Sequence, residues 1–223
     1  MRGASVLPLD GRALYRDRLD AGTRLAEQLD RFRSEHPVVL GIPRGGVPVA
    51  AEVARRLGAD LDVIVARKLG APGHEEFAIG AVTADGGRFL DQDTVRALAI
   101  DEAYVQQITA REMAEARRRE ERFRGPLGPV ELRGRTVILV DDGLATGATM
   151  RAAARAVRAR GPARLVVAVP VGAVEAVAAL ASEADEVVCP ALPEPFIAIG
   201  LHYGDFSQVE DTEVLELLQD RRR

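Results

Sequence analysis

Cysteine is nearly absent from this sequence, since Cys189 is the only one among 223 residues. A single thiol excludes an internal disulfide and a zinc site built from several cysteines. Long apolar runs are also missing: the longest, residues 165–174, is interrupted by Pro170 and Gly172 and is far too short to span a bilayer. Residues 1–5 lack the apolar core of a signal peptide. We therefore expect a soluble, cytoplasmic protein with no membrane partner.

Lysine is scarce as well, because Lys68 is the only one among 30 basic residues. The arginines are scattered along a chain with a net charge of −4, without the basic face typical of nucleic-acid binding, so no nucleic-acid partner is expected. With 47% hydrophobic residues and little net charge, the chain is not expected to be disordered. Its length suits one α/β domain with an accessory lobe.

Five short apolar runs recur at the spacing of alternating strands and helices. Each run is nearly continuous in Val, Ile and Leu, which is typical of strands buried on both faces of a parallel sheet. The predicted strands are residues 38–40, 61–66, 137–140, 165–169 and 187–188, and the helices between them are residues 47–57, 148–159 and 171–181. This order predicts an α/β fold with a doubly wound, mainly parallel sheet flanked by helices.

Other segments lie outside this alternation. A short hairpin is predicted around Asp85 within residues 82–90. Residues 101–124 predict one long charged helix, interpreted as a solvated helix that packs through a single apolar stripe, with Glu115/Arg119 and Arg117/Glu121 pairs on its surface. We expect a core of residues 1–188, which includes an N-terminal helix and this long helix, and a small C-terminal hood lobe of residues 189–223.

The chemistry is expected in residues 137–149, which read VILVDDGLATGAT. Asp141 and Asp142 directly follow a buried strand, and ligands bind beyond the carboxyl ends of strands in an open parallel sheet. The next residues combine small side chains, two hydroxyls and the start of a helix, which together favour binding of a phosphate: Ala145, Thr146, Gly147, Ala148 and Thr149. The two carboxylates can accept hydrogen bonds from adjacent hydroxyl groups of a sugar, and the loop beside them can bind a phosphate. Together they favour binding of a sugar phosphate.

Other motifs fit this segment poorly. A Walker A loop needs a lysine where Ala148 stands, and neither residues 143–147 nor residues 41–46 supply the G-x-G-x-x-G of a dinucleotide site. An ordinary strand–turn–helix with solvated turn acids remains the structural alternative.

At this point the chain resembles a known family. Residues 137–149 are similar to the phosphoribosyl-pyrophosphate signature of the type I phosphoribosyltransferases, in which a hydrophobic strand and two acids precede a T-G-x-T phosphate loop. The resemblance implies that Asp141 and Asp142 hold the ribose hydroxyls and that residues 145–149 wrap the 5′-phosphate. It also implies a Mg ion carried mainly by the substrate's pyrophosphate, with Asp141 or Asp142 as further contacts and no direct protein cage.

Three further segments support the resemblance. Arg44, Gly45 and Gly46 follow the first strand and are similar to the family's pyrophosphate loop, which predicts a cis peptide bond between Pro43 and Arg44. A simple glycine turn is the alternative there. Arg67 and Lys68 would neutralise the departing pyrophosphate, and the glycine- and proline-containing residues 69–77 predict a mobile closing loop. The loop candidates for substrate contact are His74, Glu75 and Glu76, although His74 also suits a solvated position.

The C-terminal lobe contains Phe196, which resembles the aromatic residue that stacks on the base in purine-salvage members. Tyr203 and Phe206 are instead expected to form a small satellite core. Two positions depart from the purine pattern, because Ala145 and His202 stand where hypoxanthine-guanine members have acids. The base is therefore left open, and the chain is most similar to an uncharacterised branch of the family.

These observations predict a Mg-dependent phosphoribosyltransferase that moves ribose-5-phosphate from phosphoribosyl pyrophosphate to a small heterocyclic base and releases pyrophosphate. Two alternatives stay open: a regulatory module that binds phosphoribosyl pyrophosphate or a nucleotide without turnover, and a hydrolase that uses water. A homodimer is compatible with the resemblance, but no segment of the sequence marks an interface.

Overall fold

The structure is a computed structural model that describes residues 13–220, apart from the side chains of Glu76, Leu127 and Asp220. A five-stranded sheet forms its centre, with the order β2-β1-β6-β7-β8 and parallel pairing throughout. The strands are β1 (Val38–Gly41), β2 (Asp60–Val63), β6 (Thr136–Val140), β7 (Arg164–Ala168) and β8 (Glu186–Val188). The predicted parallel sheet is confirmed, and the burial of β1 and β6 on both faces explains their continuous apolar sequence.

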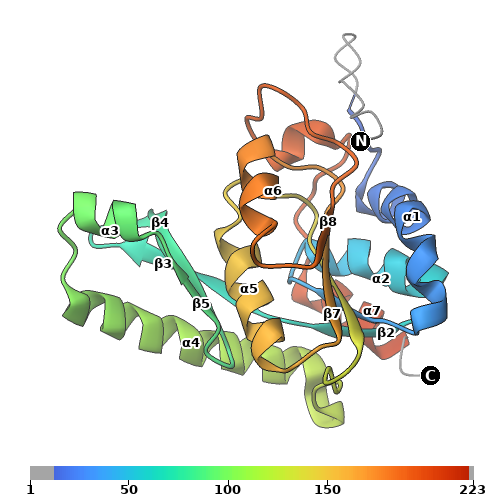
Figure 1. Ribbon diagram of the computed structural model, residues 1–223, viewed down its shortest axis with the longest axis horizontal. Helices are drawn as coiled ribbons and strands as arrows, with labels where there is room; N and C mark the ends of the chain where they lie inside the picture. Colours follow the sequence, from blue (N-terminus) through green and yellow to red (C-terminus); the bar gives the residue numbers. More distant parts are fainter. Residues whose placement is uncertain (1–12, 221–223) are drawn as a thin grey trace.

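Helices cover both faces of this sheet (Figure 1), as the doubly wound prediction requires. One face packs against α1 (Arg18–Leu29), α2 (Gly46–Leu57) and α7 (Asp211–Asp220), and the other against α5 (Ala148–Ala159) and α6 (Val174–Leu180). Helix α6 begins three residues later than predicted, because Val171 forms a β-bridge with Ala191. Within residues 13–220, none of the helices has both the length and the apolar character needed to cross a bilayer.

A second, antiparallel sheet projects from the core together with α3 (Gln92–Ala97) and α4 (Glu102–Arg124), at the left of Figure 1. Its strands are β3 (Ala66–Ala71), β4 (His74–Thr83) and β5 (Arg88–Leu90), so the hairpin predicted around Asp85 is confirmed. Short 3-10 helices η1 (Asp30–Glu35), η2 (Gly125–Leu127) and η3 (Ile199–His202) complete the elements.

Residues 69–77 do not form the predicted loop, whereas the mobility and the closing role expected of them stay predictions. These residues form most of the β3–β4 hairpin, and only Pro72 and Gly73 lie between the paired strands. Gly70 makes the pairing possible, because a Cβ there would lie 2.6 Å from the Glu75 carbonyl oxygen. The register shifts on both sides of Gly70, which marks a β-bulge in the hairpin. The predicted strand 61–66 is likewise divided between β2 and β3.

Helix α4 begins one residue later than predicted, because Asp101 is its N-cap, and its environment is less exposed than predicted. It packs against β3, β4 and α7, and it buries Glu112 and Glu120 in the same stripe as Ile108 and Ala116. The predicted pair Glu115/Arg119 is not formed, because Glu115 accepts from Arg118 and Arg119 binds Asp211 of α7. The predicted packing of α4 through a single stripe is confirmed, but this stripe also carries two buried acids, which the prediction did not include.

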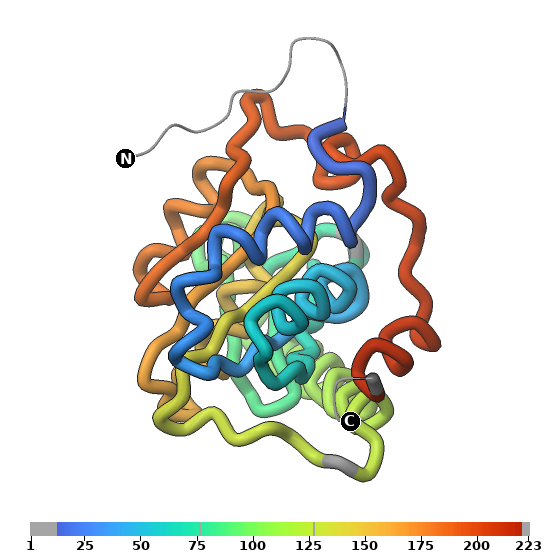
Figure 2. Tube along the Cα trace, turned by 90° about the vertical axis from the view of Figure 1, so that its right-hand side faces the viewer, coloured from blue at the N-terminus to red at the C-terminus, as the bar shows by residue number. Residues whose placement is uncertain are grey.

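The C-terminal region has two parts. Residues 191–206 pack against Tyr15, which precedes α1, and the rings of Tyr15 and Tyr203 have centroids 5.5 Å apart. Helix α7 lies against α2 and α4 instead, as Figure 2 shows near the end of the chain. The expected satellite core of Tyr203 and Phe206 is confirmed. The division into a core of residues 1–188 and a hood of residues 189–223 stays a prediction.

Candidate active site

The site lies where the sheet changes direction. Strands β1 and β6 are neighbours, but the chain continues from β1 to β2 on one side and from β6 to β7 on the other. The helices that follow them, α2 and α5, lie on opposite faces of the sheet, and both begin at the carboxyl ends of the strands. This arrangement opens a crevice between two helix N-termini, where backbone N–H groups favour an anion.

Asp141 and Asp142 occupy this crevice, directly after β6. Burial raises the pKa of the Asp141 carboxyl well above its usual range, and the neighbouring Asp142 raises it further. Burial also raises the pKa of Asp142, although Arg18 acts in the opposite direction. Two desolvated carboxyls side by side are costly in the free protein, which is typical of a functional site.

Arg18 and Tyr203 position Asp142 from distant parts of the chain. Arg18 Nε lies 2.8 Å from Asp142 Oδ2, and the same guanidinium stacks 3.9 Å above the centre of the Phe206 ring. Tyr203 donates its hydroxyl proton to the Asp142 carbonyl oxygen at 2.5 Å. The sequence analysis assigned no such role to Arg18, because nothing local in the sequence relates it to an acid 124 residues away.

The loop after the acids presents unpaired backbone donors. Among residues 13–220, no acceptor receives a hydrogen bond from the N–H groups of residues 145–147. The first regular hydrogen bond of α5 runs from Arg151 N–H to the Gly147 carbonyl at 2.8 Å. The N–H groups of residues 148–150 come before it and therefore have no acceptor within the helix. Gly147 has φ +77°, a left-handed conformation that turns the chain into the helix. The segment therefore has the properties of the predicted phosphate loop.

The loop between β1 and α2 lies directly against the acids. A Cβ on Gly45 would overlap Asp142 Oδ2, and one on Gly46 would lie 2.8 Å from the Val140 carbonyl oxygen. The Pro43–Arg44 peptide bond is cis, as predicted. Within the part of the chain that the structure describes, the N–H groups of Arg44 and Gly45 have no acceptor. The structure thus brings the predicted pyrophosphate loop into contact with the twin acids.

Arg67 and Lys68 lie on β3 beside these loops. They line a cavity of about 360 Å³ together with Pro43 of the first loop and Thr149 of the second. Lys68 also lines a second cavity, of about 550 Å³, which reaches Thr146 and Ala148. The two candidate cations are therefore placed between the predicted pyrophosphate and phosphate loops.

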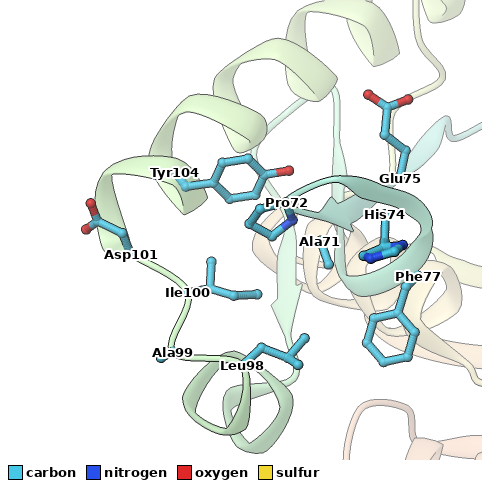
Figure 3. Close-up of a pocket in the computed structure, with 10 residues that line it drawn as sticks. All are labelled: Ala71, Pro72, His74, Glu75, Phe77, Leu98, Ala99, Ile100, Asp101 and Tyr104. Carbon is cyan, nitrogen blue, oxygen red and sulfur yellow. The ribbon is translucent and has the colours of Figure 1, made fainter.

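The other hairpin candidates lie further out. His74 lines a mainly apolar cavity of about 920 Å³ between the hairpin and the start of α4, with Phe77, Leu98 and Tyr104 (Figure 3). Glu75 lines this cavity and the 360 Å³ cavity, and it lies 3.7 Å from Arg111. The side chain of Glu76 lies outside the described residues, so its role stays a prediction.

Phe196 is already engaged within the C-terminal lobe. Its ring centre lies 5.3 Å from that of His202, and it packs against the cluster of Tyr15 and Tyr203. Ile197 and Leu201 are more open, with 75% and 63% of their surface exposed. His202 is buried, its Nε2 has no partner among the described residues, and burial lowers its pKa. Because the Phe196 ring already packs within this lobe, its base-stacking role stays a prediction.

Comparison with known proteins agrees with this geometry. A family model described as a phosphoribosyl transferase domain matches residues 12–204. The chain belongs to the phosphoribosyl transferase domain family. The match covers both anion loops, the twin acids and the β3–β4 hairpin.

Two relatives share this family likeness at high identity. One relative is a Mycobacterium tuberculosis (strain H37Rv) protein whose name describes it as a phosphoribosyl transferase. It is 47% identical over 210 residues, which are 94% of this chain and 47% of that protein. The chain thus spans about half the length of the curated relatives it matches. The crystal structure of TT1426 from Thermus thermophilus is 48% identical, with a TM-score of 0.79 over 93% of this chain and 98% of that one.

A third comparison concerns the fold alone. A hypothetical protein from Neisseria gonorrhoeae, solved with bound ppGpp, superposes with a TM-score of 0.52 at 15% identity, over 93% of this chain and 96% of that one. Together with TT1426, it places the doubly wound sheet among known folds.

Several charged residues that border the candidate site were not among those predicted from the sequence. Besides Arg18, these are residues of α4 and α7: Arg111, Glu112, Arg119 and Asp211. A signal for Glu112 did exist, since it lies four residues from both Ile108 and Ala116 in the apolar stripe of α4. An acid inside such a stripe is buried and needs a partner, which here is Arg67.

Proposed function

We propose that the protein transfers the 5-phosphoribosyl group from phosphoribosyl pyrophosphate to a nitrogen of a small heterocyclic base. The observation that carries the proposal is the contact between Gly45 and Asp142, which puts the predicted pyrophosphate loop against the predicted sugar-binding acids. A pentose with a phosphate at one end and a pyrophosphate at the other fits a site with two anion loops and carboxylates between them.

The roles of the residues follow from this placement. The N–H groups of residues 145–149 hold the 5′-phosphate, while Asp141 and Asp142 accept hydrogen bonds from the ribose hydroxyls. Arg44 and the N–H groups of the first loop hold the pyrophosphate. The bond from the anomeric carbon to the pyrophosphate oxygen breaks, a carbon–nitrogen bond to the base forms, and the N–H proton of the base passes to solvent. Arg67 and Lys68 stabilise the charge that develops on the pyrophosphate.

Magnesium is part of this proposal. Among the described residues, no group of three His, Cys, Asp or Glu side chains forms a cage for a metal. The donor set suits Mg²⁺ held by one or two carboxylates together with substrate oxygens, and Asp141 and Asp142 would supply the carboxylates. Bound there, the ion would neutralise charge on the pyrophosphate.

A panel of free bases tests the proposal. Each base is incubated with phosphoribosyl pyrophosphate and magnesium chloride, and pyrophosphate release is measured. Release that depends on one base supports the transferase. Equal release without any base indicates a hydrolase, and saturable binding without release indicates a regulatory module.

Substitution of the acids provides the matching control. Asp141→Asn or Asp142→Asn is expected to lower kcat/KM about 10²- to 10³-fold, as for the loss of a preorganised electrostatic group. Near-normal pyrophosphate release by both variants would contradict the roles assigned to the acids.

A further inference from the structure

Helix α4 completes the 360 Å³ cavity in which the proposed leaving group would lie. Pro43, Arg67, Lys68 and Thr149 form one side of this cavity, and α4 contributes further lining residues on the other: Arg111, Glu112 and Arg119. The long helix therefore borders the anion site directly.

A partly buried ion pair connects α4 to the hairpin. Glu112 Oε2 lies 2.9 Å from both Nε and a terminal nitrogen of Arg67, and only 6% of Glu112 is exposed. The other Glu112 oxygen accepts from Arg111 Nε at 3.0 Å. A charge-assisted pair of this kind, in which the carboxylate is buried and the arginine is partly exposed, holds the Arg67 guanidinium at the edge of the cavity.

One carboxylate oxygen links Arg119 to the pyrophosphate loop. Asp211 Oδ1 lies 3.3 Å from a terminal nitrogen of Arg119 and 3.9 Å from one of Arg44. Two guanidinium groups from separate elements, α4 and the loop after β1, thus converge on the same point. The second Asp211 oxygen binds Arg122 at 2.8 Å, and Glu210 lies 3.7 Å from Arg44.

This cluster has more positive than negative charge. Three guanidinium groups share the carboxylates of Asp211 and Glu210, and Glu210 itself is largely exposed. Arg119 lines the cavity, and Arg44, which does not line it, lies against the same Asp211 oxygen as Arg119. An anion that takes the place of this oxygen can therefore bind both arginines. The Arg44 contacts, at 3.7 and 3.9 Å, are longer than a direct hydrogen bond, so the loop arginine is free to exchange partners.

We propose that Arg119 binds the leaving pyrophosphate together with Arg44, and that Asp211 is the internal carboxylate which this pyrophosphate displaces. The inference rests on the proposed function, because it assigns the 360 Å³ cavity to the leaving group. It extends the site to α4 and α7, two helices outside the phosphate loops.

Binding measurements with two different ligands test this inference independently of the proposed function. Binding of inorganic pyrophosphate, with excess magnesium chloride, and of ribose 5-phosphate is measured by calorimetry. Arg119→Gln is expected to weaken pyrophosphate binding at least about tenfold, the effect of losing a hydrogen bond to a charged group, while ribose 5-phosphate binding stays unchanged. Asp211→Asn is expected to tighten pyrophosphate binding, by up to about fivefold, because it removes a competing carboxylate.

The matched control is Arg118→Gln, on the same helix, where the arginine is exposed and pairs with Glu115. It should bind both ligands as the wild type does. Equal pyrophosphate affinity in wild type and Arg119→Gln would overturn the inference alone. Wild-type protein that binds neither ligand would overturn the proposed function. If Arg119→Gln unfolds, Asp211→Asn decides: tighter pyrophosphate binding supports the inference, and unchanged or weaker binding overturns it.

Discussion

The contact between Gly45 and Asp142 leads to a specific prediction for Gly45→Ala. Gly45 has φ −62° and ψ −30°, so alanine is compatible with its backbone, and in open space the substitution would stabilise the protein by about 0.4–1 kcal/mol. The added Cβ would, however, overlap Asp142 Oδ2 and lie 2.8 Å from Asp142 Cγ and 3.2 Å from Arg18 Nε. The acid must therefore move, and its 2.8 Å bond to Arg18 must lengthen or break.

The expected cost follows from these contacts. Overpacking of a well-packed site costs about 1–3 kcal/mol, which exceeds the gain from the stiffer unfolded chain. We expect a net loss of about 1–2 kcal/mol in the free energy of unfolding. Because Asp142 is displaced from its position in the crevice, ribose 5-phosphate binding should fall at least about tenfold.

Urea denaturation and calorimetry measure the two effects. A double-mutant cycle with Asp142→Ala isolates the contact, because in that background the extra Cβ meets no carboxylate. There, Gly45→Ala should cost nothing or become slightly stabilising. The reasoning is refuted if Gly45→Ala destabilises the protein equally with and without the Asp142 carboxylate, or if the single variant binds ribose 5-phosphate as tightly as the wild type.

Three further predictions concern other groups. Burial raises the pKa of Asp141 in the folded state above its ordinary value of 3.8, so the free energy of unfolding falls as the pH rises from this ordinary value to the folded-state pKa. Thermal melts should therefore show Asp141→Asn to be more stable than the wild type near neutral pH, and the difference should shrink toward acid pH. Arg124→Met removes the guanidinium that pairs with the fully buried Asp62 and the buried Glu120, and urea denaturation should show a loss of about 3–5 kcal/mol. Burial raises the pKa of the Cys189 thiol to about 12, so its alkylation at neutral pH should be much slower than in urea-unfolded protein.

The features that the sequence predicted correctly are local. Continuous apolar runs identified the parallel strands, and the predicted helix over 148–159 has the bounds of α5. The acids and the phosphate loop are adjacent in sequence, so their proximity in space needed no tertiary information. The loop after β1 was assigned by its resemblance to the family's pyrophosphate loop, and it lies beside the acids because parallel strands end at one edge of a sheet.

The features that escaped prediction depend on distant partners. The hairpin was mistaken for a loop because Gly70, Pro72 and Gly73 are typical of loops, whereas long-range pairing with β4 decides its structure. Arg18 meets Asp142 only because α1 packs beside the mouth of the crevice. Asp211 reaches Arg44 through the docking of α7, whose own sequence shows no link to an anion site.

Lys68, which lines both cavities beside the anion loops, gives the protein an experimental handle. Apart from the α-amino group, amine-directed acylation has a single target in the whole sequence, and that target lies at the centre of the proposed site. One fluorophore attached there would report on ligand entry without any engineered residue, and protection of this amine would show whether ribose 5-phosphate or pyrophosphate enters the cavities that Lys68 lines.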